Sequence, residues 1–211
     1  EHPDTLSTAG NLAALFNDKG EYKQAEDYYK RCLEARERLL GHEHPYTNLT
    51  RFMLATLLSD QERYGESIPL RRQELEVAAK RNGCGAHGTL ISIRLLANDL
   101  YWLDELEEAE TLFREFLEDR QQVLKPSDFA IGQALGGLAK TLEEAGRLEE
   151  AAAIAQQTLD HRHEHEGPDS WWTNRDRLYL ARVLKKLGRD AEALPLLEQL
   201  QASLGNLDLP D

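Results

Sequence analysis

The chain has few of the residues that build a disulfide framework or a membrane span. Its 211 residues include two cysteines, Cys32 and Cys84, one methionine and seven prolines. The cysteines fall in different parts of the sequence, which predicts no disulfide framework and fits a reducing compartment. No apolar run approaches the roughly 18 residues that a membrane-spanning helix needs. We therefore expect a cytoplasmic protein that does not enter a membrane.

Basic residues are also scarce. The chain has 25 Lys and Arg against 38 Asp and Glu, a net charge of -13. A surface that binds nucleic acid or anionic lipid needs clustered basic side chains, so neither is an expected partner. The sequence also lacks a glycine-rich phosphate loop, a nucleophile elbow and the strand pattern that would carry them. We expect no enzymatic activity and no cofactor.

A signature that recurs every 42 residues is the main feature present. A Leu-Ala pair returns in register, and so does a small residue further along each copy. These two series are Leu12-Ala13, Leu54-Ala55, Leu96-Ala97, Leu138-Ala139 and Leu180-Ala181, then Ala25, Ser67, Ala109, Ala151 and Ala193. Self-similarity at a fixed period indicates a solenoid, in which each unit buries its apolar face against its neighbours.

Each copy reads as a pair of helices. In the first copy, apolar residues from Leu6 to Phe16 follow helical spacing, Gly20 supplies a turn, and a second periodic stretch runs from Tyr22 to Leu40. The sequence predicts an all-α solenoid of about five hairpins, approximately 2–43, 44–85, 86–127, 128–169 and 170–205. We expect one domain over 1–205 and a frayed tail over 206–211. Because the chain starts inside a repeat, we expect it to be a segment of a longer protein.

The residues Leu12-Ala13, Phe16, Gly20, Ala25 and Tyr29 resemble the tetratricopeptide repeat, whose usual length is about 34 residues. The longer period, with His2-Pro3-Asp4 at the start and Leu39-Leu40-Gly41 at the end, is similar to the variety found in kinesin light chains. The resemblance implies a right-handed superhelix that binds a protein or peptide segment. It also implies that the first helix of each repeat lines a concave groove.

Residues on the inner stripe of those first helices are the candidate peptide contacts. Asn11 matches the asparagine that repeats of the kinesin light chain type use to hold a peptide backbone. Asn98, Lys140 and Arg182 occupy one register position in three consecutive copies, and with Arg94 and Arg175 they predict an acidic or carboxylate-ended ligand. Phe52, Met53 and Leu95 predict that the same ligand has an apolar anchor. The candidates are Asn11, Phe52, Met53, Arg94, Leu95, Asn98, Lys140, Arg175 and Arg182. The alternative is that these are solvated side chains paired with acids such as Asp99, Glu143 and Glu144.

Two clusters near the fifth copy allow more than one interpretation. His161 and His165 have the i, i+4 spacing of a zinc pair, but a structural site needs four ligands, and we expect no metal. Histidines near a helix C-terminus are also favoured by its dipole. Trp171-Trp172 either forms an exposed binding element or fastens the helix start onto the preceding repeat, which we favour. The early Gly167-Pro168-Asp169 predicts a lengthened loop before this helix.

These features favour a scaffold that holds a protein segment. One alternative is a structural segment that self-associates through the solenoid ends. Another is a regulatory domain fused to a catalytic domain outside this sequence.

Overall fold

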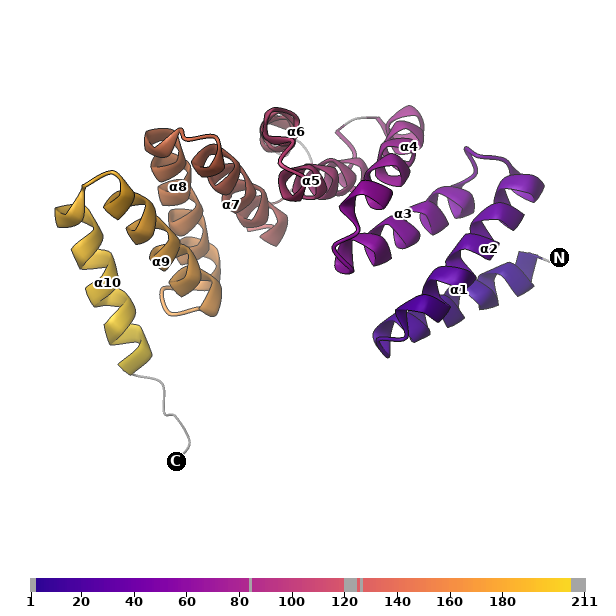
Figure 1. Ribbon diagram of the computed structural model, residues 1–211, viewed down its shortest axis with the longest axis horizontal. Helices are drawn as coiled ribbons and strands as arrows, with labels where there is room; N and C mark the ends of the chain where they lie inside the picture. Colours follow the sequence, from indigo (N-terminus) through magenta and orange to yellow (C-terminus); the bar gives the residue numbers. More distant parts are fainter. Residues whose placement is uncertain (1–2, 84, 120–124, 126, 206–211) are drawn as a thin grey trace. The chain divides into compact units, whose positions relative to one another are not determined.

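The computed structural model describes residues 3–83, 85–119, 125 and 127–205, and these residues fold into helices joined by short turns (Figure 1). Residues 206–211, the predicted frayed tail, lie outside the described residues. The all-α class is confirmed. The helices are α1 (Pro3–Asp18), α2 (Tyr22–Leu40), α3 (Pro45–Asp60), α4 (Tyr64–Asn82), α5 (His87–Trp102), α6 (Leu106–Asp119), α7 (Phe129–Glu144), α8 (Leu148–Glu166), α9 (Trp171–Lys186) and α10 (Asp190–Gly205).

The helix boundaries keep the period that the sequence predicts. The first helices begin at equivalent positions of successive 42-residue copies: Pro3, Pro45, His87, Phe129 and Trp171. The second helices also begin at equivalent positions, which are Tyr22, Tyr64, Leu106, Leu148 and Asp190. The small residues of the second series are all buried, and Ala25, Ala109 and Ala151 are fully inaccessible to solvent. Small side chains leave room for close packing of the paired helices α1–α2, α3–α4, α7–α8 and α9–α10.

The chain divides into two compact units, residues 1–104 and 105–211. Unit 1 contains α1 to α5, where each helix packs against the next, and its first core cluster joins Ala13, Tyr29 and Leu33 to Leu54 and Leu58. Unit 2 contains α6 to α10, again packed in sequential order. Each unit is a stack of helix hairpins in the manner of an α-solenoid. The prediction of one domain over 1–205 stays a prediction.

Helix starts show why the fifth copy keeps its register. The side chains of His44, Asp128 and Ser170 stand at equivalent positions and accept from backbone N–H groups of the helix that follows, Ser170 from Thr173 N at 3.0 Å. Such caps satisfy amides that lack intrahelical partners. The predicted lengthening of the loop at Gly167 is therefore wrong, because Ser170 fixes the start of α9 at Trp171.

The turn inside each hairpin requires a left-handed residue. The φ angles are +76° at Gly20, +61° at Glu62, +63° at Asp104 and +77° at Gly146. Glycine adopts this conformation without a steric cost, whereas a residue with Cβ is strained there. The second and third copies therefore carry a strained turn residue where the others carry glycine.

Replacing Glu62 with glycine is expected to raise the free energy of unfolding by about 0.5 to 1 kcal/mol, because it removes this Cβ strain. Thermal unfolding followed by circular dichroism measures the change. Glu62→Ala is the control, since it removes the carboxylate but keeps Cβ, and it should bring no gain. An equal gain in both variants would assign the effect to the side chain rather than to the backbone.

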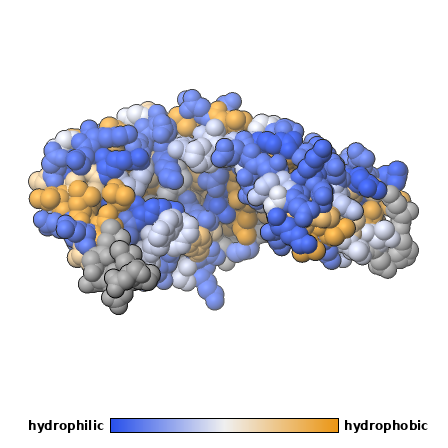
Figure 2. All heavy atoms as spheres, turned by 60° about the horizontal axis from the view of Figure 1, so that its bottom comes forward, coloured by the Kyte–Doolittle hydropathy of each residue, from blue (hydrophilic) through white to orange (hydrophobic). Residues whose placement is uncertain are grey.

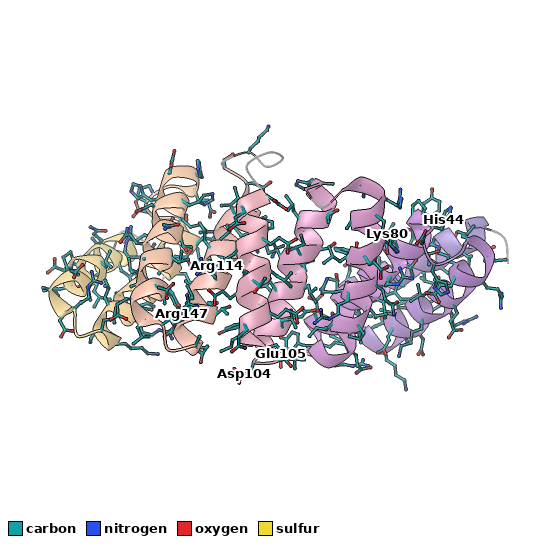
Figure 3. All side chains as sticks on the ribbon, turned by 90° about the horizontal axis from the view of Figure 1, so that it is seen from above. His44, Lys80, Asp104, Glu105, Arg114 and Arg147 are labelled. Carbon is teal, nitrogen blue, oxygen red and sulfur yellow. The ribbon has the colours of Figure 1, made fainter. Side chains whose placement is uncertain are left out.

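An ion cluster repeats at the turn edge of both units. In unit 2, Arg147 binds Glu110 of α6 at 2.7 Å and Glu150 of α8 at 2.6 Å, and Arg114 also binds Glu110, at 2.9 Å (Figure 3). In unit 1 the equivalent residue Arg63 binds Glu26 at 2.6 Å and Glu66 at 2.7 Å. The hydrogen bonds that Arg63 donates to Glu26 are the main cause that lowers the pKa of this carboxyl to about 2, and Lys30 acts in the same direction. Arg63 and Arg147 thus fasten α4 and α8 to the second helix of the hairpin before each of them.

Hydrophilic side chains cover much of the face shown in Figure 2, and apolar side chains interrupt them in separate patches. Within the described residues, no helix combines the length and apolar character needed to cross a bilayer.

Candidate functional site

The predicted contacts of unit 1 lie on its first helices. Asn11 on α1 is exposed, whereas Phe52, Met53, Arg94, Leu95 and Asn98 on α3 and α5 are half-buried. Met53 packs against the core cluster of the first two hairpins. Phe52 lines a pocket and is therefore open to a ligand. The role of each residue in peptide binding stays a prediction.

The pocket that Phe52 lines is formed by α3, α4 and α5 and has a volume of about 260 Å3. Leu49, Phe52 and Ile91 give it apolar walls, and Arg81 and Asn82 lie at the end of α4. Its other lining residues are Pro45, Asn48, Glu74, Ala78, Gly88 and Ser92. The pocket thus combines an apolar surface with a carboxylate, which suits a ligand with an apolar stem and a polar end.

Glu74 is the buried acid of this pocket. The residue is 6% exposed, and its Oε1 accepts from Asn48 Nδ2 at 3.3 Å. Its Oε2 has no hydrogen-bond partner in the described part of the chain. Burial raises the pKa of Glu74 above its usual value, although the Ser92 hydroxyl and the charges of Arg71 and Arg51 act in the opposite direction. An ionised Glu74 therefore has fewer hydrogen-bond donors than its two carboxylate oxygens can accept from.

A second buried acid in unit 1 has a structural role. Asp99 Oδ2 accepts from Arg71 Nε at 2.6 Å, Ser67 Oγ at 2.6 Å and Ser59 Oγ at 2.7 Å. Arg71 and Asp99 are 2% and 3% exposed. Asp99 is therefore not the surface partner of neighbouring groove residues that one interpretation of the sequence expected. Ser67, which stands where other copies have alanine, belongs to this network.

The predicted contacts of unit 2 are brought together on α7 and α9. Lys140 lies on α7, and its pKa is lowered first by burial of the ammonium among protein atoms, although the side chain still reaches solvent. The nearby charges of Arg175 and Arg182 lower it further. Lys140, Arg175 and Arg182 therefore form one cationic cluster within this unit.

Glu143 supplies part of the opposing charge. Arg182 Nη2 binds its Oε2 at 3.0 Å and Lys186 Nζ binds its Oε1 at 2.7 Å. Although burial acts against ionisation, the hydrogen bonds from Lys186 and Tyr179 and the charge of Arg182 hold the pKa of Glu143 below its usual value. The pairing of Arg182 with Glu143 agrees with the interpretation of solvated, paired side chains. However, the four cations Lys140, Arg175, Arg182 and Lys186 face two carboxylates, Glu143 and Asp176, the second bound by Arg175 at 2.8 Å, so the surface keeps a positive charge.

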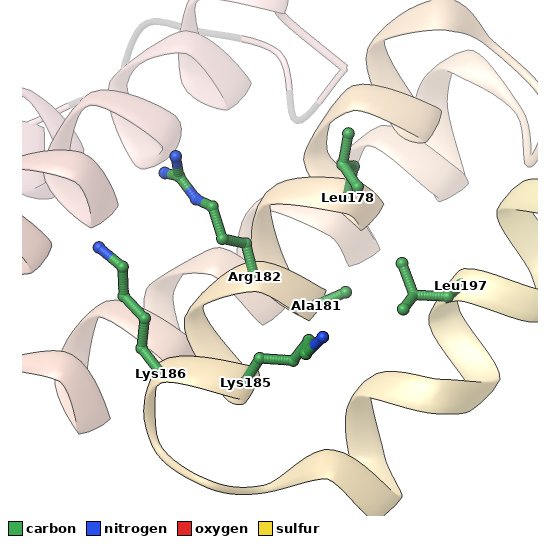
Figure 4. A pocket seen from close by; sticks show the side chains of 6 residues that line it. All are labelled: Leu178, Ala181, Arg182, Lys185, Lys186 and Leu197. Atoms are coloured by element: carbon green, nitrogen blue, oxygen red, sulfur yellow. The ribbon is translucent and has the colours of Figure 1, made fainter.

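A pocket of about 510 Å3 lies beside this cluster, between α9 and α10. Leu178, Ala181 and Leu197 give it an apolar floor, while Arg182 and Lys186 extend their charged ends to the other side of α9 (Figure 4). Lys185 also lines the pocket. Leu178 is 51% exposed. The apolar pocket and the cationic cluster therefore adjoin one another on α9.

Comparison with known proteins assigns the family. A family model described as tetratricopeptide repeat matches residues 4–80 and 88–164, well over half of the chain. The chain belongs to the tetratricopeptide repeat family. A sequence search of curated proteins finds no match.

Solved structures with the same fold include repeats of the kinesin light chain type. A putative kinesin light chain from Podosopora anserina with nearly identical TPR-like repeats has a TM-score of 0.84 and 21% identity, with 100% of each chain covered. BtubC (BKLC) from P. vanneervenii has a TM-score of 0.80 and 19% identity over 97% of this chain and 83% of that one. A Rap protein complexed with competence and sporulation factor has a TM-score of 0.69 and 16% identity, over 93% of this chain and 53% of that one.

The two aromatic residues at the start of the fifth TPR have separate roles. Trp172 packs edge-on against Phe129 at 5.0 Å between ring centroids, and Arg162 lies 5.4 Å from its centroid. Trp172 thus fastens α9 onto the preceding hairpin, as expected. Trp171 is 67% exposed and contacts Arg175, so it remains open to solvent.

The rings of the histidine pair in the fourth TPR pack edge-on rather than forming part of a ligand set. The ring centroids of His161 and His165 are 4.7 Å apart in an edge-on arrangement. Over the described ranges, no group of three or more His, Cys, Asp or Glu side chains is arranged to hold a metal ion. The expectation of no metal stays a prediction.

Sequence reasoning missed Glu74 and Ala78 as pocket residues. Their signal was present in the TPR register, because position 78 holds alanine where Arg36, Arg120 and Arg162 stand in other copies. Position 74 likewise holds an acid, whereas the equivalent positions of the other copies hold Cys32, Phe116, Thr158 and Leu200.

Proposed function

We propose that this TPR chain is a non-catalytic scaffold that holds a protein or peptide segment on its first-helix faces. TPR proteins typically serve as protein-interaction scaffolds, and the Rap protein of similar fold was solved with a bound factor. The observation that carries the proposal is the cationic cluster of Lys140, Arg175 and Arg182 next to an apolar pocket on α9. This combination provides both charge and apolar area to a ligand.

The charge of the cluster favours an acidic or carboxylate-ended peptide. Charged side chains of opposite sign steer a ligand and orient it through charge-assisted hydrogen bonds, which are most directional from arginine. Arg182 is paired with Glu143, so a ligand carboxylate would compete with or join that pair. Lys140 is exposed and close enough to Arg175 and Arg182 for their charges to lower its pKa, so a carboxylate at the cluster would be attracted by all three cations. The cluster therefore supports preference for an anion over a cation.

Binding of acidic peptides is expected to weaken at least tenfold in the double variant Lys140→Gln, Arg182→Gln, equivalent to about 1.4 kcal/mol or more. Fluorescence polarisation with a library of labelled peptides measures it, and added salt should weaken binding in the parent. Lys23→Gln, Arg31→Gln is the matched control, because it changes the net charge equally at two exposed residues of α2. Equal affinity of acidic peptides for the two double variants would refute the acidic preference.

Self-association is the second candidate. Leu194 on α10 is 57% exposed, whereas the equivalent Ala152 on α8, which α9 follows, is 4% exposed. Leu178 on α9 is 51% exposed as well, so the last described hairpin exposes apolar side chains of the kind that another hairpin covers in a solenoid. Sedimentation at increasing concentration separates the candidates. Association that is lost in Leu178→Gln, Leu194→Gln, without any peptide binding in the parent, would favour self-assembly.

A further inference from the structure

One register position near the end of the second helices holds a buried arginine in two hairpins. Arg36 on α2 is 7% exposed and Arg162 on α8 is fully buried. Arg120 has the same register but lies outside the described residues. Ala78 on α4 takes the position in the second hairpin. The second hairpin therefore lacks an arginine that its neighbours contain.

Arg36 shows what this arginine does. Its Nη1 donates to Tyr46 O at 3.1 Å and to Thr50 Oγ1 at 2.5 Å, and its Nη2 donates to Leu6 O at 3.3 Å. Its guanidinium lies 5.6 Å from the centroid of the Tyr46 ring. The cavity left beside it has a volume of only about 40 Å3. The arginine thus fills the space between its own hairpin and the next first helix.

In the second hairpin the same space is the pocket of about 260 Å3 that α3, α4 and α5 line. Ala78 and Gly88 stand where the first hairpin has Arg36 and Tyr46, and this loss of side-chain volume opens the pocket. The acceptor groups have counterparts, since Ser92 Oγ donates to Gly88 O at 3.2 Å just as Thr50 Oγ1 donates to Tyr46 O at 2.8 Å. Polar groups like those around the Arg36 guanidinium therefore line the pocket, but Ala78 supplies no guanidinium to bind them.

Glu74 adds a negative charge to this pocket. It is 6% exposed, and its Oε2 has no hydrogen-bond partner among the residues described. The nearest cations are already paired, Arg51 with Glu37 at 3.0 Å and Arg71 with Asp99 at 2.6 Å. A buried carboxylate is stabilised by a cation that donates hydrogen bonds to it. The equivalent position holds Cys32 in the first hairpin, where an arginine of the chain fills the space.

The geometry points to an arginine side chain of a protein partner as the occupant of this pocket, with its guanidinium held by Glu74 and the Ser92 hydroxyl. The planar guanidinium forms several directed hydrogen bonds, whereas a lysine ammonium is more strongly hydrated and loses more on burial. The aliphatic stem of the arginine would contact Leu49, Phe52 and Ile91. The exposed Arg81 opposes cations in general, but solvent screens its charge more than that of the buried Glu74. That the arginine belongs to a bound protein or peptide rests on the proposed peptide-binding function. That the pocket suits a guanidinium does not.

The first test measures binding of N-acetyl-arginine-amide to the full chain by chemical-shift changes in 1H–15N NMR spectra. Saturable shifts of α3, α4 and α5 amides are expected, with at least tenfold weaker binding of N-acetyl-citrulline-amide, which has the same shape without the charge. Glu74→Gln should weaken arginine binding at least tenfold. Equal binding of the citrulline compound, or no effect of Glu74→Gln, would overturn the assignment.

The second test fills the pocket from within. Ala78→Arg restores the arginine of the first and fourth hairpins, so it should abolish binding of the probe and keep or raise the unfolding temperature. Ala79→Arg, at the neighbouring half-buried position of α4, is the matched control and should leave probe binding unchanged. Unfolding of Ala78→Arg at a lower temperature than Ala79→Arg would show that the pocket does not suit an arginine.

The outcomes separate this inference from the proposed function. Peptide binding that is weakened by Lys140→Gln, Arg182→Gln but unchanged by Glu74→Gln and Ala78→Arg would overturn only the arginine pocket. Free L-arginine that binds tenfold more tightly than the capped probe would assign the pocket to a small molecule and overturn the partner assignment. Arginine-containing peptides that bind the parent and lose at least tenfold in affinity in both Glu74→Gln and Ala78→Arg would support it.

Discussion

Replacing Asp99 with alanine is expected to lower the free energy of unfolding by about 3 to 5 kcal/mol. The substitution leaves the guanidinium of Arg71, which is 2% exposed, without the carboxylate that binds its Nε at 2.6 Å. It also removes the acceptor of the Ser59 and Ser67 hydroxyls. A buried charge without its partner is far more costly than the loss of an exposed ion pair. Urea unfolding with hydrogen exchange of the α4 and α5 amides measures and localises the loss.

Two further variants make this test specific. Asp27→Ala removes an exposed aspartate from α2 and should change the free energy of unfolding by less than about 0.5 kcal/mol. The double variant Arg71→Met, Asp99→Leu removes both buried charges and should recover most of the lost stability. If Asp99→Ala and Asp27→Ala have the same urea midpoint of unfolding, the Arg71–Asp99 pair is not isolated from solvent.

Replacing Gly137 with alanine is expected to destabilise unit 2 by up to about 2 kcal/mol. A Cβ atom at Gly137 would lie 2.4 Å from Cζ of Phe113, a ring that is fully buried on α6. Overpacking of this kind costs about 1 to 3 kcal/mol, of which the higher helix propensity of alanine recovers about 1. Thermal unfolding measures the net effect.

The neighbouring glycine provides the matched control. A Cβ at Gly136 would meet its nearest atom, Thr158 Cγ2, at 3.8 Å, an ordinary contact. Gly136→Ala should therefore stabilise α7 by up to about 1 kcal/mol. Two adjacent and chemically identical substitutions are thus expected to have opposite signs. A stabilising Gly137→Ala would show that α6 and α7 are not packed as closely as the structure places them.

The same glycine shows why the candidate site could be predicted only in part. Gly137 has the same register in its first helix as Asn11, Met53 and Leu95, which the periodicity places on the inner stripe. The periodicity identifies the stripe because a helical face is set by local spacing. It does not show that Phe113 covers one member of the stripe while Phe52 stays open to a pocket. Exposure of each position depends on the size of side chains from other helices.

By itself the sequence determined the 42-residue period, the helix pairs, the small buried residues and the left-handed turn positions. These features follow from local geometry, since capping, helical spacing and the sign of φ depend on residues close together in the chain. The tertiary structure alone decided that Ser59, Ser67, Arg71 and Asp99 meet in one buried network and that Ala78 leaves a pocket beside Glu74. The residues of such clusters lie far apart in sequence, and only packing between helices brings them together.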